Sequence, residues 1–197
     1  MIYPHRQHLR DHGQMNNMRR LISTLVLAIA LGGCVTYSEA DSYVNDVRGE
    51  VHRSAEKGPI QVTLIGNPFG GSGAKLEGIV LAAMQRHLDW LDAKIVIVPA
   101  RTAGDRILFV IDPVAVRHTR DICDDTAGVP FERDATTMRI GAIYCTNKVA
   151  SEVWARLDRP VTADDAELAK AIDGLSWRVI PWTTMDQLDY PPVGSDS

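Results

Sequence analysis

The residues with the clearest chemical potential form a glycine-rich loop, 66–73, between a predicted strand and a predicted helix. Loops in that position can bind phosphate, because backbone N–H groups and the helix dipole point at the anion. The P-loop pattern fails because Ser72-Gly73 stands where Lys-Ser/Thr belongs, and Leu76 replaces the third glycine of the dinucleotide-binding pattern. Two interpretations remain: an anion- or ligand-binding loop, or a turn whose glycines supply positive φ. The residues concerned are Gly66, Asn67, Gly70, Gly71, Ser72 and Gly73.

The same segment nearly matches the turn that carries the nucleophilic serine of some hydrolases. Residues 70–74 have alanine in place of the final glycine, and four residues separate them from the predicted strand. A triad would also need His118 together with an acid such as Asp105 or Asp112. We therefore favour a protein that is not an enzyme. The alternative is a small periplasmic hydrolase or an anion-binding enzyme that uses the 66–73 loop.

A second group of polar residues lies near the middle of the chain. It consists of His118, Asp121, Cys123, Asp124 and Asp125. A mixed set of imidazole, thiolate and carboxylate without a second nearby cysteine or histidine is a weak metal-binding pattern. We interpret this segment as a solvated acidic loop beside a disulfide, and we expect neither a metal nor another cofactor.

The N-terminal region has the pattern of an export signal. Two arginines follow Met18, an apolar segment spans residues 21–31, and two glycines lead to Cys34. The apolar segment is too short for a bilayer, which needs roughly 20 residues, and the pattern is typical of a secretory signal peptide. Residues 31–34 resemble the lipobox of bacterial lipoproteins, with glycine where alanine or serine is usual. This resemblance implies cleavage before Cys34 and its acylation, and two or more acyl chains anchor a protein firmly.

The resemblance also predicts the location and the domain boundaries. Residues 1–33 are the leader and signal peptide, with Met18 as the expected true start. Under the enterobacterial sorting rule, Val35 after the lipidated cysteine implies the periplasmic face of the outer membrane. We expect a lipid anchor and polar tether over 34–58, a periplasmic domain over 59–190 and a frayed tail over 191–197.

The composition of the mature chain limits its partners. The leader carries four arginines and one aspartate, so the 21 basic and 25 acidic residues fall to 17 and 24, a net charge of −7. This balance, without a dense basic run, argues against nucleic-acid binding. In the oxidising periplasm, the remaining pair of cysteines, Cys123 and Cys145, is expected to form a disulfide worth about 3 kcal/mol.

The hydrophobic pattern predicts an α+β domain with a mixed or antiparallel sheet and helices packed on one face. Strands are expected over 61–65, 95–98, 106–111, 118–123 and 137–145. Helices are expected over 74–91, 149–157 and 162–172, the last beginning at Thr162 and ending near Gly174.

Residues 66–69 after a strand, with a later Tyr144-Cys145, are similar to small uncharacterised envelope lipoproteins of proteobacteria. That resemblance implies no activity. The sequence as a whole predicts a lipid-anchored envelope protein that acts as a non-enzymatic binding or assembly module. Its expected partners are the membrane, through the lipid on Cys34, and another envelope protein.

Overall fold

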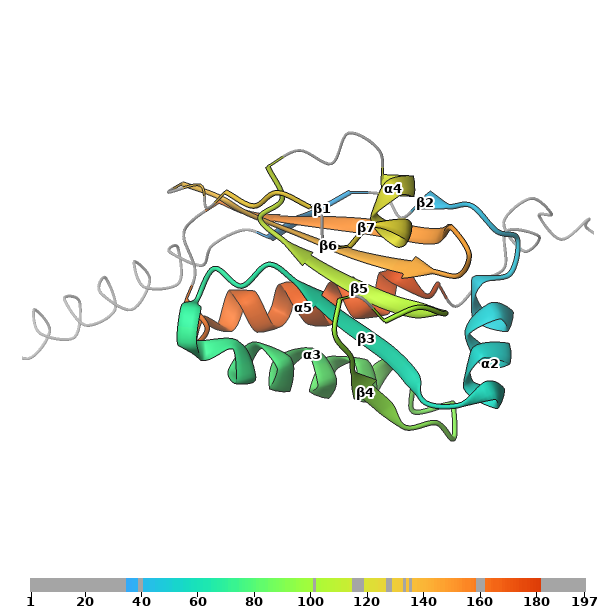
Figure 1. Ribbon diagram of the computed structural model, residues 1–197. Helices are drawn as coiled ribbons and strands as arrows, with labels where there is room; N and C mark the ends of the chain where they lie inside the picture. Colours follow the sequence, from blue (N-terminus) through green and yellow to red (C-terminus); the bar gives the residue numbers. More distant parts are fainter. Residues whose placement is uncertain are drawn as a thin grey trace, which may run out of the picture. The chain divides into compact units, whose positions relative to one another are not determined.

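Seven strands form one mixed sheet, seen in the computed structural model of Figure 1. They are β1 (Val35–Tyr37), β2 (Asp41–Ser42), β3 (Ile60–Ile65), β4 (Ile95–Ile97), β5 (Arg106–Ile111), β6 (Met138–Cys145) and β7 (Val149–Leu157). Their order is β1-β7-β6-β5-β3-β4, and β2 also pairs with β7. β3 is parallel to β4 and β5, whereas the other pairs are antiparallel.

The structure describes residues 35–38, 41–100, 102–114, 119–126, 129–132, 134, 136–158 and 162–181.

The central strand β5 is buried on both faces of the sheet. All six of its residues are buried, and its apolar run is typical of a strand covered on both sides. Alternate side chains point to opposite faces, so Ile107 and Phe109 join the larger core, while Leu108 and Val110 join a smaller cluster. The two clusters define the two covered faces of the sheet.

The helices cover these two faces unequally (Figure 1). α3 (Gly73–His87) and α5 (Ala166–Val179) pack against each other on the face of the sheet that carries the larger core. α2 (Val47–Lys57) lies beside β3. The short helix α4 (Thr119–Asp124) lies over the opposite face, and the 3-10 turn η1 (Gly70–Ser72) leads into α3. The predicted α+β class with a mixed sheet is confirmed, and α4 adds one short helix on the second face. Among the described residues, no helix is long and apolar enough to cross a membrane.

The predicted tether over 34–58 is wrong for the part of it that the structure describes. Val35 pairs with Leu157 in the register of β1 and β7, and β2 pairs with the same strand. α2 buries Val47 and Val51 in the core. These elements therefore belong to the same compact unit as the rest of the sheet, and that unit begins at Val35. Composition misled here, because an edge strand and a helix with two buried residues can both be largely polar.

Two element types differ from their predictions. Residues 149–157 form the nine-residue strand β7 rather than a helix, because pairing with β6 and β1 on both sides satisfies its backbone. Residues 119–124 form helix α4 rather than a strand. Both segments are short apolar runs, for which hydrophobic periodicity alone does not separate helix from strand.

The last helix differs from its prediction at both ends. Its N-cap is Asp165, which accepts a hydrogen bond from the backbone N–H of Glu167 at 2.9 Å. The helix continues through Gly174, where a Cβ atom would lie 2.3 Å from the Tyr37 hydroxyl oxygen. This glycine therefore permits close packing against β1 instead of ending the helix.

The strand register defines two ends of the sheet. Val35 and Leu157 lie at one end together with Gly66, which follows β3, and Asp112, which follows β5; we call this the Gly66 end. The opposite end contains Ile60, Arg106, Cys145 and Val149, and we call it the Cys145 end. The chemistry-bearing residues divide between these two ends.

Candidate functional site

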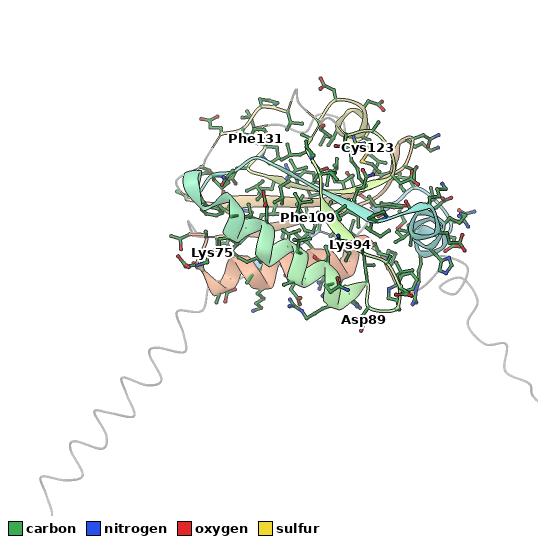
Figure 2. The ribbon with its side chains drawn as sticks, turned by 60° about the horizontal axis from the view of Figure 1, so that its bottom comes forward. Lys75, Asp89, Lys94, Phe109, Cys123 and Phe131 are labelled. Carbon is green, nitrogen blue, oxygen red and sulfur yellow. A yellow bond between two sulfur atoms is a disulfide. The ribbon has the colours of Figure 1, made fainter. Side chains whose placement is uncertain are left out.

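A disulfide fixes α4 to the sheet at the Cys145 end. Cys123 of α4 and Cys145 of β6 have their sulfur atoms 2.02 Å apart and their Cα atoms 5.6 Å apart, so the predicted pairing is confirmed. Cys145 is fully buried and Cys123 nearly so. Figure 2 shows Cys123 on the far side of the sheet from α3. The bond thereby links this short helix covalently to the sheet.

Arg106, the first residue of β5, lies beside this disulfide. The strand register places it directly opposite Cys145. Its guanidinium donates hydrogen bonds to the carbonyl oxygens of Gly104 at 3.1 Å and Cys123 at 2.7 Å. Arg106 therefore connects the loop before β5 to α4 through backbone carbonyls.

The charge of Arg106 is buried, and none of the described carboxylates lies close enough to pair with it. The residue is only 6% exposed, and no carboxylate lies within 4.0 Å of it in the described part of the chain. Its Nε–H group is buried and has no acceptor there. Burial lowers the pKa of Arg106, and the Asp124 carboxylate acts in the opposite direction. Burying an ionised group without an ion-pair partner is costly, which distinguishes Arg106 from the other described arginines.

A polar cavity of about 570 Å³ opens beside Arg106. Three segments line it: the loop between β4 and β5, the end of α4 with the residues after it, and the turn between β6 and β7. Its lining consists of Ala100, Thr102, Ala103, Gly104, Arg106, Cys123, Asp124, Asp125, Thr126, Thr146 and Asn147. The cavity thus combines one buried cation with exposed carboxylates on α4 and on the segment after it.

Two of the three threonine hydroxyl groups in the cavity lining contact other oxygen atoms of the protein. The Thr126 hydroxyl donates to the Ala100 carbonyl, and the Thr146 hydroxyl lies 3.3 Å from Oδ1 of Asn147. Neither is paired with a histidine or another general base among the described lining residues.

The glycine-rich loop lies at the opposite end of the sheet from this cavity. At Gly66 φ is +83°, and a Cβ atom there would lie 2.4 Å from the Ile111 carbonyl oxygen. The Asn67 side chain donates to the Gly70 carbonyl and accepts from the Phe69 backbone N–H. These contacts give Gly66 and Asn67 a role in the turn itself, whereas the loop's predicted role in ligand binding stays a prediction.

The structure places the two alternative acids of the hydrolase pattern at opposite ends of the sheet. Asp105 lies at the Cys145 end and accepts a hydrogen bond from Ser54 at 3.1 Å. Asp112 lies at the Gly66 end and accepts from the backbone N–H of Arg139 at 2.9 Å. The whole length of β5 separates the two acids. His118 and the side chain of Ser72 lie outside the described residues.

The disulfide removes Cys123 from the candidate set of metal ligands. Cys123 is bonded to Cys145 and has no thiolate to offer a metal. Within the described residues, no group of three or more histidine, cysteine, aspartate or glutamate side chains could hold a metal ion. The side chain of Asp121 lies outside that set, as do Cys34, the leader and the tail over 191–197.

Comparisons with solved structures find chains that are only loosely similar to this one. No model of a known protein family matches the sequence, and no curated protein does. A chain of a PelC dodecamer from Paraburkholderia phytofirmans, solved as a point variant, is 9% identical, with a TM-score of 0.39. The match covers 77% of this chain and 99% of that one.

Proposed function

We propose that this chain is a lipid-anchored protein of the bacterial cell envelope, and that its folded domain is a non-enzymatic binding or assembly module. The proposed location is the periplasmic face of the outer membrane, with the lipid on Cys34. The disulfide agrees with an oxidising compartment, because such bonds are rare in the reducing cytosol.

The observation that carries this proposal is the residue at which the compact unit containing the sheet begins. The compact unit begins at Val35, and β1 begins at the same residue. A signal peptidase acting at the lipobox would leave Cys34 as the first residue of the mature chain. The boundary expected from the leader and the boundary of the fold therefore differ by a single residue. A cleaved, acylated protein would keep every element that the structure describes.

The alternative function is a small hydrolase or anion-binding enzyme built on the 66–73 loop. In its favour, the loop connects a buried parallel strand to the amino end of the long helix α3. Against it, the Asn67 side chain and the Gly70 carbonyl already bond to each other within the loop. We therefore rank this function second.

Intact mass measurement of the membrane-extracted protein tests the proposal. The expected mass is that of residues 34–197 plus acyl chains, with two alkylatable thiols that become available only after reduction. A Cys34→Ser variant should be recovered without acyl chains and serves as the control. A full-length, unacylated product with free thiols would contradict the proposal, and the 66–73 loop would then become the leading candidate site.

A further inference from the structure

The cavity beside Arg106 has the charge arrangement of a site for a small zwitterion. We propose that it binds a molecule with one carboxylate and one ammonium group, such as a free amino acid or a short peptide. The carboxylate would lie toward Arg106 and the ammonium toward Asp124. This inference concerns the folded domain alone and does not depend on acylation of Cys34.

The buried guanidinium supplies the anion-binding half of the site. Arg106 donates to two backbone carbonyls, which are neutral acceptors and do not balance its charge. A guanidinium carries five N–H donors in a planar fork that fits a carboxylate. Its Nε–H group has no acceptor in the described structure, although the residue is more than nine-tenths buried. A carboxylate bound in the cavity would supply a negative charge that the described residues do not place within ion-pair distance of Arg106.

The exposed Asp124 in the cavity lining favours a ligand that also carries a positive charge. Asp124 is exposed on α4 and lines the same cavity as Arg106. Its carboxylate attracts the guanidinium, although the two are not among the ion pairs within 4.0 Å that the described residues form. A dianion such as phosphate would be repelled by this acid, whereas an ammonium group would be attracted. A volume of about 570 Å³ has room for both charges of one small molecule.

A purely structural role for Arg106 makes a different prediction. As a clamp between Gly104 and Cys123, the residue would affect only the stability of the fold. Binding of a zwitterion, in contrast, requires both charged groups of the cavity and must respond to a change at the exposed Asp124. The Asp124→Asn change separates the two roles, since it removes one charge from the surface without altering the buried hydrogen bonds.

Titration of the oxidised, ¹⁵N-labelled full chain with diglycine, followed by NMR, tests the proposal. Amide signals of Gly104, Cys123 and Asn147 should shift saturably, with a Kd of about 1 mM or tighter. Acetate, which carries only the carboxylate, should bind about tenfold more weakly. Arg106→Gln should abolish the diglycine shifts, with circular dichroism confirming that the variant is folded.

The exposed acid provides the decisive variant. Asp124→Asn should weaken diglycine binding by about fivefold and leave acetate binding no weaker. Asp89→Asn makes the same charge change at a residue that does not line the cavity. It should change neither the affinity for diglycine nor the affinity for acetate. The proposal is overturned if diglycine gives no saturable shift at ~10 mM. It is also overturned if Asp124→Asn leaves the preference for diglycine over acetate unchanged.

Discussion

At the scale of single residues, Gly66 is the backbone position with the strictest requirement. Its φ is +83°, and a Cβ atom added there would lie 2.4 Å from the Ile111 carbonyl oxygen, which leaves no room for a side chain. We expect Gly66→Ala to lower the free energy of unfolding by about 2–4 kcal/mol. Gly78→Ala is the control, because a Cβ there meets nothing within 4 Å and should stabilise α3 by about 0.5–1 kcal/mol. Urea denaturation measures the free energy of unfolding of both variants. Equal changes in the two would contradict a special backbone requirement at Gly66.

Asp134 should give a small pH dependence of stability at acid pH. It accepts hydrogen bonds from the Thr136 backbone and hydroxyl and from the Thr137 hydroxyl, and these lower its pKa to about 2. Because the folded pKa is below the unfolded value, the stabilisation is present above about pH 4 and is lost as pH falls through about 2. A carboxyl NMR titration should show the low midpoint, and Thr136→Val should raise it. A midpoint near 4 in the native chain would refute this assignment.

Arg106 can be singled out in the sequence, but the residues that surround it in the fold cannot. Arg106 is the one charged residue at the start of an otherwise apolar strand, which is a visible signal. Its partners come from the Gly104 loop and from Cys123, 17 positions further along. The pairing of Cys123 with Cys145 is predictable from the cysteine count and the compartment. That the pair places α4 over Arg106 depends on the sheet register, which local sequence does not contain.

At the scale of elements, the disulfide is expected to hold α4 on the sheet. α4 has only six residues, too few to be stable as an isolated helix. Removal of the bond by Cys123→Ser with Cys145→Ser should lower the free energy of unfolding by about 3 kcal/mol. It should also release the Cys123 carbonyl from Arg106 and weaken diglycine binding. Reductant should destabilise the native chain but leave the double variant unaffected; a native chain unchanged by reduction would contradict this role.

A helix or strand can be predicted from the sequence when residues close to it in the chain determine its structure. The sequence predicts α3 within a few residues, because Leu76, Val80, Ala83 and Met84 repeat at helical spacing. It also predicts the strand at 106–111, since apolar β-branched residues bounded by turns are a local signal. It misses β1, which depends on pairing across more than 100 positions, from Val35 to Leu157. It also misses β7, which is held as a strand by β1 on one side and β6 on the other. Long-range pairing overrides local propensity in such segments.

At the scale of the whole molecule, the register sets the orientation that an anchor on Cys34 would impose. β1 begins at Val35 at the Gly66 end, so acyl chains on the preceding residue would hold that end against the membrane. Two of the exposed large apolar side chains belong to this end: Val114 is 50% exposed and Phe131 is 43% exposed. Figure 2 shows Phe131 and Cys123 at opposite ends of the same face. The cavity at the Cys145 end would consequently face away from the bilayer.

Carboxyl footprinting of the acylated protein on phospholipid vesicles measures this orientation. Glu132 and Asp158 are exposed at the Gly66 end and should be protected from labelling when the protein is membrane-bound. Asp41 and Glu56 are exposed toward the Cys145 end and should react as fast as in the unanchored Cys34→Ser chain. Equal labelling of all four acids would show that the domain moves freely about its anchor.

The apolar side chains at the Gly66 end should strengthen this orientation. Val114→Glu places a charge at the expected membrane surface and should reduce the protection of Glu132, because burying a charged group at an interface is unfavourable. Trp177→Glu is the matched control, since Trp177 is 48% exposed near the carboxyl end of α5, whose Val179 carbonyl accepts from Ser151 toward the Cys145 end. If the Trp177 variant lost protection and the Val114 variant kept it, the opposite end of the sheet would be the one that faces the lipid.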